Sequence, residues 1–285
     1  MVHAKMHLDP LMALSMQSLK KVLLIGSLLT PWHGWICAQV VSPLPRAHAH
    51  NDYEHERPLE DALDAGFCSV EADVFAVDGA LWVAHDRIHL DPKRTLTSLY
   101  LDPLQKLIQQ QGGVVYDHKT AFYLMIDFKS EGASTYEICQ QVIQPYRYIL
   151  SYVNAEGFHQ GPVTIVISGN RPIDLIENQT ERWVFVDGRL SDMKSNQKPS
   201  SLIPWVSENW KNHFSWDGTG VMPEAEAKAL RRWIDQAHDQ GRKVRFWATP
   251  ETENFWRTAY QAGLDFLNTD QLLAMRQVLL SLPSP

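Results

Sequence analysis

Cysteine is scarce in this sequence, with 3 in 285 residues. Cys37 lies in a segment that we expect to be removed, whereas Cys68 falls in an expected buried strand and Cys139 in an expected helix. Two cysteines cannot form a zinc cage alone, and we expect neither to act as a nucleophile. Free buried thiols are the main interpretation, and a disulfide between the two stays open if the compartment is oxidising.

An excess of positive charge is also missing. The chain has 26 Lys and Arg residues against 33 Asp and Glu residues, which gives a net charge of −7. Binding to nucleic acid without sequence preference depends on clustered Lys and Arg, so we expect no nucleic-acid partner. A small phosphate-bearing substrate is still compatible with this charge, because a bound metal ion inverts the local charge.

Long apolar runs are missing after the N-terminal segment. Lys20 and Lys21 precede the apolar stretch Val22–Leu29, and a small-residue cleavage point follows at Ala38. This order is typical of an export signal, and the apolar stretch is short for a bilayer span of about 20 residues. We therefore expect residues 1–38 to be a signal peptide and the protein to be exported, either periplasmic or secreted. An uncleaved membrane anchor is the alternative, and otherwise we expect at most peripheral membrane contact.

No repeat, low-complexity tract or long linker divides residues 39–285, so we expect one domain there. Helical and extended patterns alternate, and short apolar strands fit burial on both faces of a parallel sheet. The fold class is therefore α/β, and a single (β/α)₈ TIM barrel is the predicted architecture. A doubly wound open sheet is the alternative, but its glycine-rich first turn is absent from His48–Asp52. The expected strands cover residues 46–50, 68–75, 121–128, 163–167, 183–186, part of 213–216, 244–247 and 265–267.

A β-hairpin arm is expected after the second strand. Asp78-Gly79 is a typical two-residue hairpin turn, and residues 80–84 follow it as a second extended segment. No crossover helix separates the two segments, so they must pair in antiparallel fashion. The arm then ends at His85-Asp86.

Three carboxylates are placed where the reactive groups of a barrel lie. Glu71 and Asp73 are two residues apart on one strand, so both side chains point to the same face. Asp127 and Lys129 repeat this spacing at the end of the next strand. The carboxylates would repel one another without a cation, and their hard oxygen atoms suit Mg²⁺ or Ca²⁺. We therefore predict a divalent-cation site formed by Glu71, Asp73 and Asp127.

Two histidines flank this predicted metal site. His50 ends the first strand, and the arm brings His85 over the same end of the barrel. Histidine gives or takes a proton near neutral pH, so the pair could act as base and acid in a displacement at phosphorus. Lys129 would offset the developing negative charge. Three further candidates for substrate contact near the strand ends are Asn51, Trp247 and Asp270.

The order of these motifs resembles the superfamily of glycerophosphodiester phosphodiesterases and phosphatidylinositol-specific phospholipases C. The matching pieces are His50, Glu71-Ala-Asp73, Asp78-Gly79 with His85-Asp86, Asp127-Phe-Lys129 and the late Asn268-Thr-Asp270. The resemblance spans residues 46–270 and implies a phosphoric diester hydrolase. It also implies a small phosphodiester or a phospholipid head group as substrate.

Two departures from the familiar glycerophosphodiesterases limit what the resemblance says about substrate. Those enzymes have His-Arg-Gly after the first strand, where this chain has His50-Asn-Asp52, and so it lacks the arginine that would bind phosphate. Their Pro-Glu-Asn-Thr element is represented only by Arg57-Pro-Leu-Glu60. Asp127, where many members have glutamate, is closer to the sphingomyelinase D-like branch, and the start His48-Ala-His-Asn-Asp-Tyr53 resembles a distinct branch. The substrate is therefore expected to be either phospholipid-derived or of the glycerophosphodiester type.

Two other functions fit parts of the same pattern. A metal-dependent amidohydrolase would use His48 and His50 as ligands for Zn²⁺ or Mn²⁺. We prefer to place His48 lower in the barrel as a hydrogen-bonded core residue. A catalytically silent barrel that binds lipid or carbohydrate through its tryptophan-rich rim is the other alternative.

Overall fold

The structure is a computed structural model, and it describes residues 41–283. The expected signal peptide and its cleavage point, within residues 1–38, lie outside the described residues. From Val41 onward the chain forms one compact unit. In this unit we find no helix with the length and apolar character that crossing a membrane requires.

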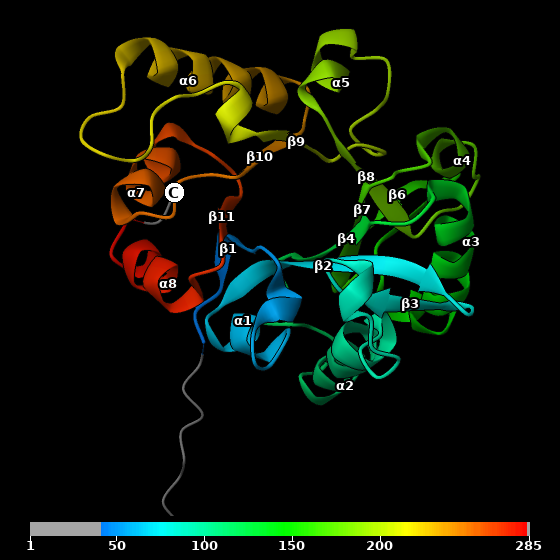
Figure 1. The fold of residues 1–285 in the computed structure, drawn as a ribbon. Coiled ribbons are helices and arrows are strands. Elements are labelled where there is room, and N and C mark those ends of the chain that lie inside the picture. The colour runs from blue at the N-terminus through cyan, green and yellow to red at the C-terminus, as the bar shows by residue number, and fades with distance from the viewer. Residues whose placement is uncertain (1–40, 284–285) are drawn as a thin grey trace, which may run out of the picture. The chain divides into compact units, whose positions relative to one another are not determined.

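Eight parallel strands form the centre of this unit (Figure 1). Their order in the sheet is β10-β9-β8-β7-β4-β2-β1-β11, and a parallel bridge between Arg245 and Phe266 joins the two end strands. The nearly closed barrel that results confirms the predicted TIM-barrel fold. The strands are β1 Leu44–Ala49, β2 Phe67–Val77, β4 Phe122–Phe128, β7 Val163–Gly169, β8 Val184–Gly188, β9 Trp205–Asn209, β10 Lys243–Trp247 and β11 Leu267–Thr269.

Helices surround the strands on the outside of the barrel, as Figure 1 shows. Local sequence signals explain where they begin and end. The helix at 253–262 starts at Thr252, whose hydroxyl accepts a hydrogen bond from the amide of Phe255, and it stops at Gly263, which has a φ of 95°. The α-helices are α1 Glu60–Asp64, α2 Asp102–Gln110, α3 Gly132–Ile143, α4 Ile173–Glu177, α5 Leu190–Ser195, α6 Glu224–Asp239, α7 Glu253–Ala262 and α8 Leu272–Leu280. Shorter helical turns cover Asp52–Glu54, Arg87–His89, Thr97–Leu101, Gln144–Ile149 and Trp210–Asn212.

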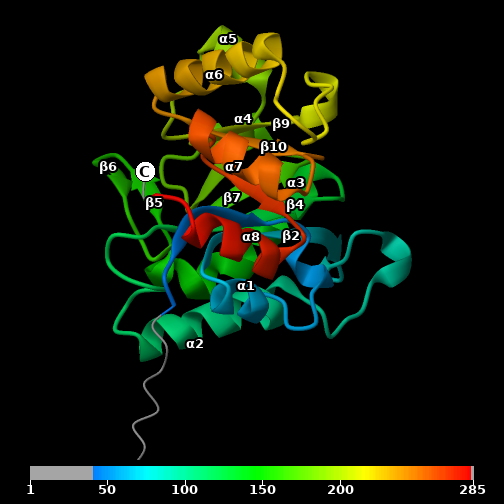
Figure 2. The ribbon, with the colours of Figure 1, turned by 90° about the vertical axis from the view of Figure 1, so that its left-hand side faces the viewer.

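The predicted arm is present. β3, Ala80–Val83, pairs in antiparallel register with β2, and Asp78 and Gly79 between them both have positive φ, as a tight hairpin turn requires. Figure 2 shows the loop after β3 and the loop between β9 and α6 projecting on the same side, where the parallel strands end. A second hairpin, β5 Tyr152–Asn154 with β6 Gly157–His159, lies on the other side and was not expected from the sequence.

The expected position of the sixth barrel strand is wrong. The strand is β9, Trp205–Asn209, and not a segment within 213–216. Phe214 and Trp216 imitate a strand because they are aromatic, but they are buried as loop residues. Phe214 stacks on Trp210 with ring centroids 4.1 Å apart. Aromatic residues alone therefore did not identify a strand, because residues 213–216 pair with no neighbouring strand in the described part of the chain.

Candidate active site

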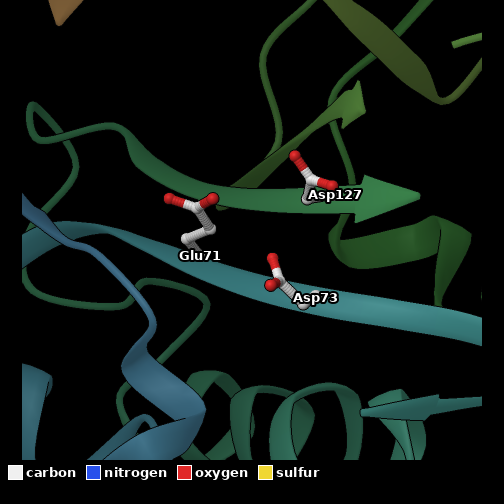
Figure 3. A group of neighbouring side chains, drawn as sticks. All are labelled: Glu71, Asp73 and Asp127. Carbon is white, nitrogen blue, oxygen red and sulfur yellow. The ribbon is translucent and has the colours of Figure 1, made fainter. Parts of the chain in front are cut away.

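The three predicted carboxylates meet at the end of the barrel where the arm attaches. Glu71 and Asp73 lie on β2 and Asp127 on β4, and the strand register sets Asp73 directly beside Asp127. One oxygen atom from each carboxylate lies within 4.8 Å of the others. Figure 3 shows all three side chains extending from the same face of the two strands. Parallel pairing of two strands therefore builds the cluster that the spacing predicted.

Two cations compensate this acidic cluster from within the protein. Arg245 Nη2 donates to Glu71 Oε2 at 2.5 Å, and Lys129 Nζ lies 3.0 Å from Asp73 Oδ2 and 3.1 Å from Asp127 Oδ1. Lys129 was expected here, whereas Arg245 was missed. Arg245 is the one charged residue inside the apolar stretch Val244–Trp247, and that contrast was the available signal. The cluster thus holds three carboxylates against two fixed positive charges.

These contacts pull the carboxylates' pKa values in different directions. Burial alone would raise the pKa of Glu71, but the charge of Arg245 and the hydrogen bond from His48 hold this pKa well below its usual value. The pKa values of Asp73 and Asp127 are raised, first by burial and then by the charge of Glu71. The ionised form is therefore favoured for Glu71 and disfavoured for Asp73 and Asp127.

Among residues 41–283, each carboxylate of the cluster uses one oxygen for hydrogen bonds and leaves the other free of them. Glu71 Oε2 accepts from Arg245 and His48, Asp127 Oδ1 from Lys129, and Asp73 Oδ2 from Lys129, Tyr53 and His85. Within residues 41–283 the buried Asp73 Oδ1 has no hydrogen-bond partner. Buried oxygens without donors are costly, and such oxygens are the usual ligands of Mg²⁺ and Ca²⁺. The donor set therefore fits a hard divalent cation.

His50 is held by a carboxylate on the neighbouring strand end. Its Nδ1 atom lies 2.8 Å from Asp270 Oδ1 and 3.0 Å from the side-chain nitrogen of Asn51. Burial by itself would lower the pKa of His50, but the hydrogen bond to Asp270 and the charge of Glu71 outweigh it, so the pKa is raised. With Nδ1 occupied in this way, Nε2 is the nitrogen left to meet a substrate. The structure thus brings two of the three candidate contact residues, Asn51 and Asp270, to His50.

His85 is oriented by Asp73 and by a tyrosine that sequence reasoning missed. The Nδ1 atom of His85 lies 3.0 Å from Asp73 Oδ2 and 3.3 Å from the Tyr53 hydroxyl. That hydroxyl donates to Asp73 Oδ2 at 2.7 Å and lies 3.0 Å from Asn51 Oδ1. His85 is 58% exposed, so these two contacts are what fix its ring. Tyr53 stands three residues after His50 in a turn, where nothing in the pattern indicated that it points back into the barrel.

His48 lies lower in the barrel and is completely buried. Its Nδ1 atom lies 2.7 Å from Ser69 Oγ and its Nε2 atom 3.2 Å from Glu71 Oε2. Burial, with the charge of Arg245, lowers the pKa of His48 to about 4. Both ring nitrogens are engaged, and the possible metal-binding cluster found in residues 41–283 contains no histidine. The arrangement that the amidohydrolase alternative needs is therefore not formed by the described residues.

A cavity of about 590 Å³ borders His85 on the arm side of the cluster. Its lining combines imidazole, guanidinium, amide and carboxylate groups. The lining residues include Asn51, Tyr53, His55, His85, His89 and Arg94. Trp247, the third candidate contact residue, lies away from this cavity, and its ring packs 5.1 Å from the guanidinium carbon of Arg189.

Several known proteins are similar to this chain. A family model described as "AIM6-like phosphodiesterase domain" matches residues 37–187. "Altered inheritance of mitochondria protein 6 homolog" from Arthroderma benhamiae is 29% identical over 269 residues, covering 83% of this chain and 84% of the relative. "Altered inheritance of mitochondria protein 6" from Eremothecium gossypii is 30% identical over 278 residues, covering 82% and 69%. The family match confirms the resemblance to phosphodiesterases that the motif order indicated.

Two solved structures are also similar. Glycerophosphodiester phosphodiesterase from Agrobacterium tumefaciens has a TM-score of 0.45 and 12% identity, covering 82% of this chain and 100% of that chain. The phosphatidylinositol-specific phospholipase C from Listeria monocytogenes has a TM-score of 0.47 and 10% identity, covering 84% and 94%.

The predicted location needs correction. The relatives from Arthroderma benhamiae and Eremothecium gossypii are named for an altered inheritance of mitochondria, which contradicts the expectation of a periplasmic or secreted protein. The expectation rested on the basic and apolar pattern of residues 20–38 alone. A short basic segment followed by an apolar one is not specific enough to carry it.

Proposed function

The chain belongs to the family of AIM6-like phosphodiesterase domains, and on that premise we propose that it is a metal-dependent phosphoric diester hydrolase. The observation that carries the proposal is the set of three carboxylates whose oxygens approach within 4.8 Å between two anchored histidines. Two histidines, each held by a carboxylate through Nδ1, are suited to passing protons through Nε2.

Glu71, Asp73 and Asp127 would hold the cation, Mg²⁺ or Ca²⁺. When bound, it supplies Lewis-acid polarisation of the phosphate and fixes its orientation. Lys129 lies beside two of the three carboxylates and adds a positive charge next to the position of the phosphate oxygens. Arg245 has a different role. It forms an ion pair with Glu71, and its charge keeps that carboxylate ionised.

The two histidines divide the proton transfers. In our assignment the Nε2 atom of His50 takes the proton of the attacking hydroxyl or water as its oxygen bonds to phosphorus. Protonated His85 gives its Nε2 proton to the leaving oxygen as the phosphorus–oxygen bond breaks. His85 lines the cavity of about 590 Å³, so the leaving group occupies that cavity. Asp73 and Tyr53 hold the His85 ring for this transfer.

We propose phospholipid-derived or glycerophosphodiester-type molecules as the substrate class, since the superfamily resemblance supports both. The mixed donors and acceptors of the arm-side cavity suit a polar head group better than an acyl chain. An internal hydroxyl of the substrate or a water molecule can serve as the nucleophile.

Hydrolysis of bis(p-nitrophenyl) phosphate by the full chain tests the proposed reaction. We expect turnover with Mg²⁺ or Ca²⁺, loss of turnover with EDTA, and loss in Glu71→Ala. Phospholipids would be assayed in parallel, because the artificial diester has no internal hydroxyl. If neither class of diester turned over with any cation, while lipid or carbohydrate still bound to Glu71→Ala, the silent binding barrel would replace this proposal.

A further inference from the structure

Two arginines stand side by side on the part of the barrel mouth formed by β7 and β8. Arg171 follows β7 and Arg189 follows β8. Arg171 Nη1 donates to the main-chain oxygen of Asp187, and Arg189 Nη1 lies 3.4 Å from that same oxygen. Two guanidinium groups that reach one oxygen atom must be close neighbours. Arg182 and Arg242 also donate to main-chain oxygens, but each binds a different oxygen, so they do not form such a pair.

The carboxylate of Asp187 compensates only one of the two charges. Asp187 Oδ2 accepts from Arg189 at 2.8 Å and from Ser168 at 2.7 Å, and its Oδ1 accepts from Ser207 at 2.5 Å. Its hydrogen-bonding capacity toward the arginines is therefore largely used by Arg189. Asp192 is a second acid nearby, but it accepts the main-chain N–H of Arg189.

Arg171 has no ion pair with any of residues 41–283, although it is only partly exposed. Its Nε atom is buried and has no hydrogen-bond partner there. Burial and the neighbouring Arg189 lower the pKa of Arg171, although Asp187, Asp192 and Asp127 act against this. A half-buried cation beside a like charge is unfavourable unless an anion joins it.

This arginine pair adjoins the acidic cluster. Gly169 ends β7 with a φ of +67°, and a Cβ atom at that position would lie 2.5 Å from Asp127 Oδ1. The main chain that leads to Arg171 therefore passes against a carboxylate of the proposed metal site. On the other side, the Arg189 guanidinium packs 5.1 Å from the ring of Trp247. The pair lies away from the arm-side cavity, which is lined by the loops after β1 and β3.

From this geometry we propose that Arg171 and Arg189 bind a second anionic group of the substrate, a phosphomonoester or a carboxylate. That group belongs to the part of the diester that stays on the phosphorus while the leaving group occupies the arm-side cavity. Paired guanidinium groups match the oxygen atoms of such anions in geometry and charge. The inference rests on the proposed function and names its substrate class: phosphodiesters that carry one additional anion.

Three synthetic diesters with the same leaving group test this. They are the p-nitrophenyl phosphodiesters of a butyl chain ending in hydroxyl, carboxylate or phosphomonoester. We expect the full chain to turn over the anionic diesters with a kcat/KM about 10- to 100-fold above that of the hydroxyl diester. In Arg171→Gln and Arg189→Gln this ratio should fall toward one. Arg171→Lys should keep part of it, because it retains the charge but loses the planar fork.

Arg87→Gln is the matched control, since Arg87 is an exposed arginine in the short helical turn after the arm, where it packs over Phe75. It should leave the ratio unchanged. An equal loss on all three diesters in Arg171→Gln would assign Arg171 to the scissile phosphate and overturn the inference. A wild-type kcat/KM ratio near one between the anionic diesters and the hydroxyl diester would also overturn the inference.

Calorimetric titration with inorganic phosphate in EDTA separates this inference from the proposed function, because it needs no turnover. Binding that weakens about tenfold or more in Arg171→Gln and Arg189→Gln, but not in Arg87→Gln, would support the anion site even if no diester were hydrolysed. Equal binding by all variants would overturn the anion site while leaving the phosphodiesterase proposal intact. Circular dichroism of each variant verifies that the barrel is folded.

Discussion

Along β4, β7, β8 and β9 the lower part of the barrel interior is apolar, whereas the upper part, two residues further along the same strands, is polar. Met125, Val166, Phe185 and Trp205 form the lower layer together with Phe266. Two positions later, the four strand residues are followed by Asp127, Ser168, Asp187 and Ser207. Residues at i and i+2 of a strand share one face, so each of these four strands contributes to both layers.

The difference shows how one barrel separates stability from chemistry. In the lower layer the rings of Trp205 and Phe266 are 4.5 Å apart and those of Tyr123 and Phe266 are 5.4 Å apart, which is close aromatic packing. Beside Asp127 in the upper layer, the buried Asp73 keeps one oxygen, Oδ1, without a hydrogen-bond partner among residues 41–283, and this costs stability. Changes in the lower layer should therefore alter folding, and changes in the upper layer should alter turnover.

The largest effect is expected at His85, on the rim of the upper layer. His85→Ala should lower kcat by about 10²- to 10⁴-fold because the proton donor is lost, and the melting temperature should stay the same because the side chain is 58% exposed. Steady-state kinetics and a thermal melt measure both. His118→Ala is the control, since His118 is an exposed histidine outside the site. Near-normal turnover in His85→Ala would remove the assignment of His85.

Arg245→Met should break the distinction between the layers, because it harms both stability and chemistry. Glu71 would become a buried carboxylate without its cation, which should cost about 3–5 kcal/mol of unfolding free energy. Added Mg²⁺ or Ca²⁺ should raise the melting temperature of this variant more than that of the wild type. The buried Arg242, which has no carboxylate partner within the described residues, provides the control Arg242→Met. If the cation stabilised both variants equally, the role of Arg245 in charge compensation would be disproved.

Met125→Ala tests the lower layer alone. Met125 is 1% exposed, and its truncation should cost about 2–5 kcal/mol of unfolding free energy through the cavity that it leaves. The kcat per folded molecule should not change. Urea unfolding combined with kinetics measures both quantities. A fall in kcat comparable to that of His85→Ala would show that the two layers are not independent.

The smallest effect is expected at Asp270. Its carboxylate raises the pKa of His50, and kcat/KM should rise with pH as His50 loses its proton to become a base. Asp270→Asn should lower this pKa and move the acidic limb of the profile to lower pH. Asp270 is 54% exposed, so the shift should stay below about one pH unit. A shift toward higher pH would contradict the pairing of His50 with Asp270.

Much of the fold could be predicted because short-range sequence patterns identify most of its strands. The stretch around Glu71 is apolar on both sides and ends in an Asp-Gly turn, so the strand and its arm follow from short-range rules. The carboxylate spacing then indicated the acidic cluster. β9 was misplaced because Trp205–Asn209 is short and polar at its end, while the aromatic residues after it are more conspicuous.

Arg245 and Tyr53 were missed for a different physical reason. Arg245 acts across the barrel on Glu71, 174 positions away in the chain, and Tyr53 acts on Asp73 of the neighbouring strand, 20 positions away. Hydrophobic periodicity reports which face of an element is buried, but it does not report which buried polar groups will meet once the barrel closes. The catalytic candidates lay within short motifs, whereas their partners are set by tertiary structure.

The seam of the barrel is closed at the residue that neutralises Glu71. Arg245 forms the parallel bridge with Phe266, and the amide of Phe266 donates to the main-chain oxygen of Val244 at 3.2 Å. Local opening of this seam therefore also loosens the ion pair in the site, and the two equilibria are linked. Any ligand that favours the intact ion pair must slow hydrogen exchange at Phe266. We therefore expect a ligand of the acidic cluster that strengthens or weakens the Arg245–Glu71 pair to change hydrogen exchange at this backbone amide.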